Sequence, residues 1–84
     1  MLGYTKYKVE VTLNNPAQGK TMIQYLTTRL NVTKIIEFIG KFDFEFHADF
    51  KSPMEIENFM TELRTKFHAM KDYEIMPILK DEMR

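Results

Sequence analysis

Hydrophobic and polar residues alternate along two segments of the chain, which predicts two strands that each bury one face. Between positions 7 and 13 the odd-numbered residues are apolar and the even-numbered residues are polar. A longer alternation covers residues 42–50, where the apolar positions are Phe42, Phe44, Phe46, Ala48 and Phe50. The polar positions between them are Asp43, Glu45, His47 and Asp49. A period of two residues is that of a strand with one face in the core.

Two other segments carry apolar residues at helical spacing. In the first, Asn15 is the expected N-cap and Pro16 the first helical position, and the apolar residues that follow are Met22, Ile23, Leu26 and Leu30. The second opens with the capping box Ser52-Pro53-Met54-Glu55 and continues with Ile56, Phe59, Met60, Leu63 and Phe67. The spacing predicts one helix that ends at Asn31 and another that ends near Phe67.

Two further strands complete the pattern. Residues 32–39 are rich in branched side chains, and the glycine of Gly40-Lys41 permits a tight turn from this segment into the aromatic strand. Residues 73–79 form the last apolar segment, and Pro77 within it predicts a strand at the edge of the sheet or one with a bulge. The order strand, helix, strand, strand, helix, strand is that of an α+β, ferredoxin-like βαββαβ domain, a four-stranded antiparallel sheet with two helices on one face.

The two faces of this sheet are expected to differ. The phenylalanines of residues 42–50 should pack against the helices, which argues against an RNA-stacking platform, because such a sheet carries its aromatic residues on the helix-free face. If Phe38, Ile75 and Leu79 also face the helices, four apolar residues point away from them: Ile35, Ile39, Met76 and Ile78. On a domain this small, such a face is better explained by a second copy that packs against it, sheet to sheet, than by exposure of the apolar residues to water.

Composition narrows the function classes. The 84 residues make one domain, of a size at which a partner subunit often completes the core. Twelve basic residues balance twelve acidic ones, so these residues alone are not expected to bind DNA. There is no cysteine and no apolar segment of signal-peptide length, so we expect a cytoplasmic protein or a domain of one, with no membrane attachment.

Catalytic and metal-binding chemistry is not indicated. Glu45, His47 and Asp49 alternate on one strand, where three side chains converge poorly on an ion, and pairing with Lys6 and Lys8 on a neighbouring strand is the simpler interpretation. No nucleophile with a base and no phosphate-binding loop is present, and residues 12–19 lack the arginine of an acylphosphatase-like anion loop. The sequence predicts neither an enzyme nor a cofactor.

The segment "NVTKIIEFIGKFDFEFHADFKSPMEIENFMTELRTKFHAMKDYEI" resembles the C-terminal regulatory (RAM) domain of the Lrp/AsnC transcription regulators, especially archaeal members. The likeness covers residues 2–79. It lies in the order and spacing of four short motifs, "NV", "IGKFD", "ELRTKF" and "DYEI", of which "IGKFD" matches the family's Gly-x-x-Asp. It implies a ferredoxin-like domain that dimerises through its sheet, assembles further into tetramers or octamers, and binds an amino acid between dimers. DNA is bound in the family by a separate N-terminal helix-turn-helix domain.

The resemblance assigns Gly40 and Asp43 to the effector loop, with Lys41 beside the bound anion or solvent. Exposed backbone amides near a glycine can hold a carboxylate, and an aspartate can accept from an ammonium group. The alternative for these residues is a plain hairpin turn with a solvated aspartate. No helix-turn-helix precedes Tyr4, and "LGYTKY" resembles the linking strand of longer members, which favours a domain excised from a longer regulator. An ACT-like amino-acid-binding module, free or attached to an enzyme, is the alternative function.

Overall fold

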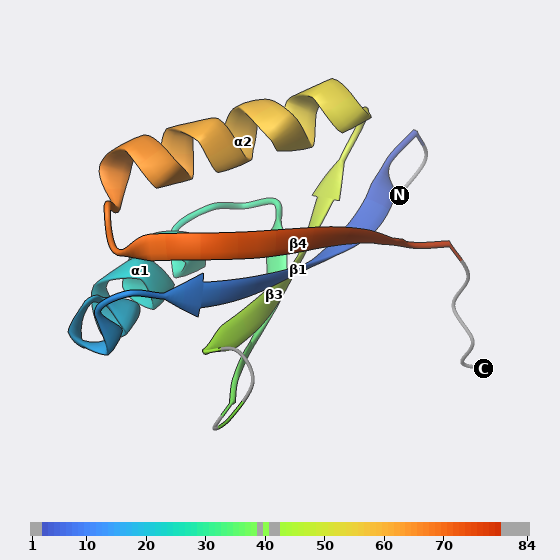
Figure 1. The fold of residues 1–84 in the computed structure, drawn as a ribbon. Coiled ribbons are helices and arrows are strands. Elements are labelled where there is room, and N and C mark those ends of the chain that lie inside the picture. The colour runs from blue at the N-terminus through green and yellow to red at the C-terminus, as the bar shows by residue number, and fades with distance from the viewer. Residues whose placement is uncertain (1–2, 39, 41–42, 80–84) are drawn as a thin grey trace.

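Four strands and two α-helices alternate along the part of the chain that the computed structural model describes, residues 3–38, 40 and 43–79. Figure 1 shows them in chain order. The elements are β1 (Thr5–Leu13), the short 3₁₀ helix η1 (Pro16–Gln18), α1 (Gly19–Thr27), β2 (Val32–Glu37), β3 (Phe44–Phe50), α2 (Pro53–Lys66) and β4 (Met70–Ile78).

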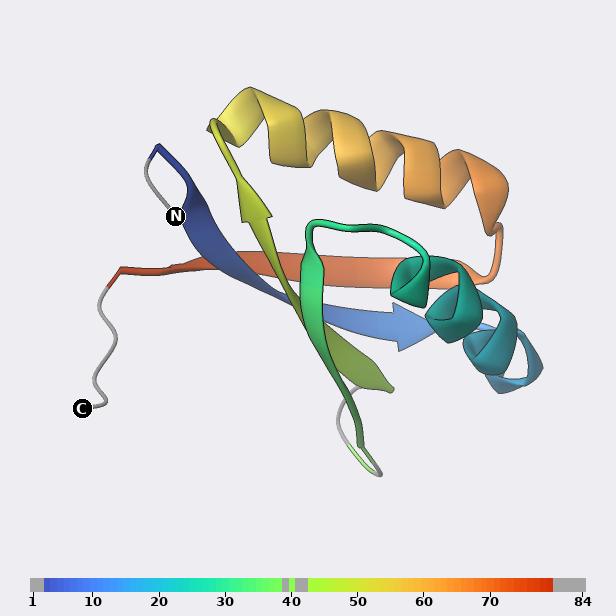
Figure 2. The same cartoon turned by 180° about the vertical axis from the view of Figure 1, so that it is seen from behind.

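The strands form one antiparallel sheet in the order β2-β3-β1-β4, so that β1 and β3 lie at its centre. Both helices pack on the same face, as the front and back views show (Figures 1 and 2). The predicted ferredoxin-like α+β arrangement is therefore confirmed. Pro77 lies in the edge strand β4, where its missing N–H costs no hydrogen bond between central strands.

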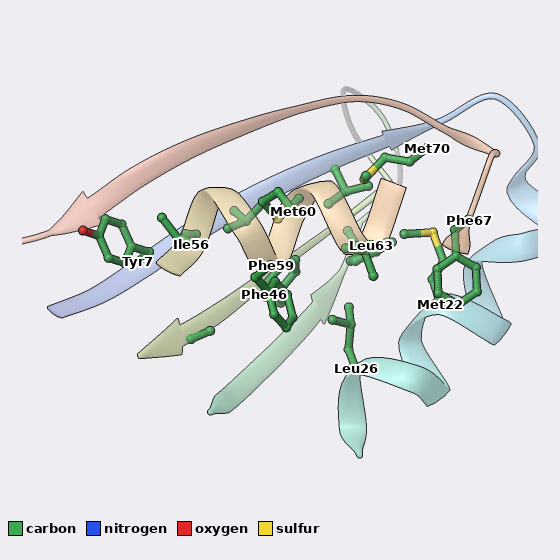
Figure 3. Packing of buried hydrophobic residues seen from close by; sticks show 14 of the residues in the cluster. Tyr7, Met22, Leu26, Phe46, Ile56, Phe59, Met60, Leu63, Phe67 and Met70 are labelled. Atoms are coloured by element: carbon green, nitrogen blue, oxygen red, sulfur yellow. The ribbon is translucent and has the colours of Figure 1, made fainter. Parts of the chain in front are cut away.

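The core lies between the helices and the sheet (Figure 3). The alternation of residues 44–50 places the apolar side chains of β3 under α2, where Phe59 stacks at ring-centroid distances of 6.0 Å from Phe46 and 5.3 Å from Phe50. Phe44, Phe46, Ala48 and Phe50 are all buried, as predicted. Phe42 lies outside the described residues.

The N-terminus of α2 has the capping geometry that its sequence predicts. The Ser52 hydroxyl accepts a hydrogen bond from the Glu55 backbone N–H at 3.2 Å, and the Glu55 carboxylate accepts one from the Lys51 N–H at 2.8 Å. The first bond satisfies a donor that a helix start otherwise leaves free, and the second fastens Glu55 to the residue before the cap instead of to the Ser52 N–H.

Ser52→Ala is expected to lower the free energy of unfolding by about 1 kcal/mol, because the cap is lost while the buried face of α2 is unchanged. Thermal denaturation should show a midpoint lower by roughly 4–8 °C. Thr61→Ala, at an exposed position inside the same helix, is the control and should not lower it. Equal midpoints for Ser52→Ala and the parent would exclude the cap as a source of stability.

The first helix is shorter than predicted. Asn15 does act as a cap, since its side chain accepts from the Ala17 N–H at 3.0 Å, but the helix that it starts is a single 3₁₀ turn. The α-helix begins at Gly19, where a Cβ atom would lie 3.2 Å from the Leu13 side chain, so glycine allows α1 to start close to the end of β1. Leu30, predicted to continue the apolar stripe, lies beyond the helix and is fully exposed.

The predicted orientation of β2 is wrong. Ile35 pairs with Phe46 and packs against the core, so it faces the helices, and Ile36 pairs with Glu45 on the other face. The cause is a bulge between Val32 and Lys34, which inserts one residue and inverts the alternation along the rest of the strand. Ile39 lies outside the described residues.

Two residues expected under the helices are not in the core. Phe38 follows the end of β2 and is 39% exposed, and Leu79 follows the end of β4 and is 84% exposed. The bulge inverts the alternation of β2, so position 38 is in phase with Ile36 and not with Ile35. Leu79 lies past Ile78, the last paired residue of β4, so the alternation of that strand no longer directs its side chain. Strand β4 also begins at Met70, three residues before the predicted start at Tyr73.

Candidate functional site

The sheet face opposite the helices carries most of the charged side chains of the strands. We call it the helix-free face. Among the described residues, the strand pairing places on it Lys6, Lys8, Glu10 and Thr12 of β1, Lys34 and Ile36 of β2, Glu45, His47 and Asp49 of β3, and Asp72, Glu74, Met76 and Ile78 of β4. Met76 and Ile78 were predicted to point away from the helices, and their pairing with Lys8 and Lys6 confirms this.

The charges on this face lie in rows that cross the sheet. Glu10 pairs with Glu45 on one side and Glu74 on the other, which makes an acidic row. The next row has Lys8 in the centre, paired with His47 and Met76, and Lys34 beyond His47. An acidic row and a basic row are therefore neighbours at the middle of the face.

Two ion pairs and one contact between a carboxylate and an imidazole join these residues. Lys6 Nζ lies 3.1 Å from Asp49 Oδ1, which is one of the predicted cross-strand pairs. Lys8 Nζ lies 3.8 Å from Glu10 Oε2 on its own strand instead of pairing with Glu45. Glu45 Oε2 lies 2.7 Å from His47 Nε2, and Glu45 is only 8% exposed although no helix covers it. The face thus already shields a carboxylate from water in a single copy of the chain.

A hollow of about 600 Å³ lies on the helix-free face where β4 passes beside the central strands. Its polar lining is Lys8, Glu45 and His47, and its apolar lining comes from the last residues of β4, including Met76 and Ile78. Partly exposed apolar side chains thus adjoin the ion pairs, which gives the face an apolar margin around a polar centre.

The hairpin between β2 and β3 contains the predicted effector residues. Gly40 has φ +130°, a conformation that favours glycine. Asp43 connects three strands: its backbone N–H donates to the Val11 carbonyl at 2.9 Å, its carbonyl accepts from the Phe38 N–H at 3.0 Å, and its carboxylate Oδ2 accepts from the Leu13 N–H at 2.8 Å. Asp43 is more than a solvated strand residue, and Lys41 lies outside the described residues.

Asp43→Ala is expected to lower the free energy of unfolding by roughly 1–3 kcal/mol, because the Leu13 N–H loses its charged acceptor in a partly buried position. Chemical denaturation measures this change directly. Asp72→Ala is the matched control, since the Asp72 carboxylate also accepts from a backbone N–H, that of Tyr73 at 2.8 Å, but at an exposed position. Its effect should stay within about 0.5 kcal/mol. Similar losses for both variants would show that the hydrogen bond to Leu13 contributes no more to the free energy of unfolding than an exposed one.

Two features of the helix-free face were missed by sequence reasoning. Ile36 takes the place predicted for Ile35, and only the bulge in β2 reveals this. The burial of Glu45 depends on its neighbours across β1 and β2, which the sequence alone does not identify. A signal was present in the alternation of Glu45 and His47, which places the two side chains on one face of a strand.

Neither a cluster of metal-ligating side chains nor a membrane-spanning helix is found in residues 3–38, 40 and 43–79. Within them no group of three or more His, Asp or Glu side chains is arranged to hold a metal ion. None of their helices is both long and apolar enough to cross a membrane.

Comparison with solved structures shows the same fold in transcription regulators. The transcriptional regulator NMB0573 from Neisseria meningitidis, solved in complex with L-Met, matches 95% of this chain with a TM-score of 0.81 and 14% identity. AsnC from E. coli matches 95% of the chain with a TM-score of 0.81 and 10% identity. The chain spans about half of each of these proteins, 53% and 54% respectively.

A smaller protein matches along its whole length. TTHA0845 from Thermus thermophilus matches 95% of this chain and 99% of its own, with a TM-score of 0.79 and 11% identity. No family model matches the sequence, and neither does any curated protein. The likeness is therefore one of fold, shared both with about half of larger regulators and with a chain of similar size.

Proposed function

We propose that this chain is an effector-binding and oligomerisation domain of the Lrp/AsnC type, which senses a small molecule, most simply an amino acid. The observation that carries the proposal is the likeness of 95% of the chain to part of a transcription regulator whose structure contains L-Met. The sequence resemblance in "IGKFD" and "DYEI" supports the same assignment independently. In this proposal the domain works in the cytoplasm, performs no catalysis, and reaches DNA only through a separate domain.

Self-association is the first part of the proposal. A second copy covers the helix-free face, with Met76 and Ile78 of β4 and Ile36 of β2 contributing apolar contacts. In a two-fold interface each contact occurs twice, with the roles exchanged. A two-fold axis between the acidic row and the basic row sets Lys8 of each copy against Glu10 of the other. The face is thus self-complementary in charge.

Effector binding is the second part. The hairpin residues Gly40, Lys41 and Asp43 form part of a pocket between dimers, where backbone amides near Gly40 hold the carboxylate of an amino acid. The Asp43 carboxylate has two oxygens, so Oδ1 can accept from an ammonium group while Oδ2 keeps its bond to Leu13. A ligand at such a contact shifts assembly only if it binds the assembly states with different affinity. Dimers assemble into tetramers or octamers in this proposal.

An ACT-like amino-acid-binding module that acts without a DNA-binding domain is the second candidate. The match to TTHA0845, which covers 99% of a chain of similar length, favours it. Both candidates bind an amino acid, so the discriminating observation is whether the reading frame upstream of this segment encodes a helix-turn-helix.

The proposed function is tested by thermal denaturation of the purified chain with each of the twenty free L-amino acids. We expect at least one to raise the midpoint, because a ligand at 100 times its dissociation constant stabilises the folded state by about 2.7 kcal/mol. The same amino acid should change the mass distribution in light scattering. No shift with any of the twenty would contradict an amino-acid sensor.

A further inference from the structure

A second hollow, of about 370 Å³, lies on the helix side of the sheet at the end of β3, where α2 begins. It is lined by Tyr4 before β1, Arg29 and Asn31 from the connection between α1 and β2, Asp49 and Phe50 of β3, and one stripe of α2 that includes Asn58, Phe59 and Glu62. Figure 2 shows these segments meeting below the N-terminal half of α2. We call this hollow the α2 groove. Its volume lies in the range of about 300–1,000 Å³ that small-molecule sites occupy.

The position of Arg29 in the α2 groove is fixed by aromatic rings. The Arg29 guanidinium carbon lies 5.8 Å from the centre of the Tyr25 ring and 5.9 Å from that of Phe59. Backbone hydrogen bonds from the Arg29 N–H to Leu26 and from the Val32 N–H to Arg29 hold the chain on either side. Stacking on rings satisfies the charge only in part and leaves the N–H donors of the guanidinium available.

Three residues of the lining, Arg29, Asn58 and Glu62, are exposed to solvent and carry polar groups without a protein partner among the described residues. Within the described part of the chain, no hydrogen bond or ion pair engages the Arg29 guanidinium, the Asn58 amide or the Glu62 carboxylate. Of the other two acidic residues of the lining, Asp49 directs its carboxylate to Lys6 on the helix-free face, and Glu55 accepts from the Lys51 N–H. The lining therefore offers a cation from the connection between α1 and β2, an amide and an anion from α2, and the aromatic side chains of Phe50 and Phe59.

We infer that the α2 groove binds the zwitterionic head group of a free amino acid, with the carboxylate on Arg29 and the ammonium group on Glu62 and Asn58. Opposite charges in the lining of one small hollow match a ligand whose ammonium and carboxylate groups are bonded to the same carbon atom. A purely cationic or anionic ligand would leave one of the two unsatisfied. The inference rests on the proposed function and adds a second effector site to it.

This site differs from the hairpin pocket in two ways. It lies at the C-terminal end of β3, whereas Gly40 and Asp43 precede the N-terminal end of the same strand. It is also complete within one protomer, so binding needs no neighbouring copy. An effector can therefore occupy the α2 groove in every assembly state, while the pocket between dimers exists only after assembly.

The test is titration calorimetry with the free L-amino acid that stabilises the parent most, and with its carboxamide, which lacks the negative charge. We expect one molecule of amino acid per chain in the groove and weaker binding of the carboxamide. Arg29→Gln should weaken binding of the amino acid roughly 10- to 100-fold and remove its advantage over the carboxamide. Glu62→Gln should weaken both ligands. Arg64→Gln and Glu57→Gln, on α2 but outside the groove, are the matched controls and should change nothing.

The same titrations in the Lys8→Glu background, where dimers are disfavoured, separate this inference from the proposed function. Retained binding that Arg29→Gln abolishes supports the α2 groove as a site within one protomer. If the parent binds but Arg29→Gln and Glu62→Gln bind equally well in both backgrounds, the inference is wrong and the proposed function stands. If the parent binds none of the twenty amino acids, the inference and the amino-acid part of the proposed function both fail.

Discussion

Reversal of one charge on the helix-free face, by Lys8→Glu or by Glu10→Lys, is expected to weaken dimerisation roughly 100-fold or more, and an equimolar mixture of the two variants is expected to dimerise again. Each single variant sets like charges against each other twice in a two-fold interface, which costs several kcal/mol. In the mixture, the glutamate that replaces Lys8 in one chain meets the lysine that replaces Glu10 in the other, and the unchanged Lys8 meets the unchanged Glu10. Analytical ultracentrifugation of each variant and of the mixture measures these species.

Two controls define this experiment. Lys20→Glu, at an exposed position of α1 on the other side of the sheet, makes the same charge change and should leave dimerisation unchanged. Circular dichroism should show the parent fold in all variants, because Lys8 and Glu10 lie outside the core. Dimers of undiminished stability in both single variants would place the interface on another surface.

Leu26→Ala is expected to lower the free energy of unfolding by about 2–5 kcal/mol, whereas Leu30→Ala should change it by about 0.5 kcal/mol or less. Both leucines belong to one apolar stripe in the sequence, but Leu26 is fully buried and Leu30 fully exposed. The first change leaves a cavity in the core between the helices and the sheet, and the second removes atoms that already contact water. Chemical denaturation of the two variants provides the comparison.

Equal losses for the two leucines would mean that Leu30 is covered, and a second copy that packs over the connection between α1 and β2 would be the first candidate. Repeating the Leu30→Ala measurement in the Lys8→Glu background distinguishes this, because a loss caused by another copy should become smaller when dimers are disfavoured.

The central and C-terminal elements could be predicted because their signals are local. The alternation in β3 and the capping box of α2 fix both the type of element and the face that it buries. The turn at Asn15 was recognised too, but whether it opens a 3₁₀ turn or an α-helix depends on packing against Leu13, which lies outside the helix.

The face of β2 could not be predicted, because its alternation is broken by a bulge. Residues 32–39 have apolar side chains at both odd and even positions, so the pattern gives no preferred face. A single inserted residue then decides which of Ile35 and Ile36 enters the core. The prediction for Phe38 was wrong because of the same bulge, and that for Leu79 because β4 ends at Ile78.

The two candidate sites differ in how far the sequence reveals them. The helix-free face follows from the alternation of three strands, so most of its members could be named in advance. The α2 groove joins Tyr4, Arg29, Asp49 and Glu62 from four separate segments, and no spacing in the sequence connects them. Its key cation lies in a connection without periodic pattern, which is why Arg29 gave no signal.

Whether a second copy of this chain covers the helix-free face can be decided by sedimentation equilibrium of the purified chain over a range of concentrations. We expect a species of twice the 10.1 kDa of one chain, or a larger even multiple, at micromolar concentration. A single species of 10.1 kDa at every concentration would contradict the proposed interface.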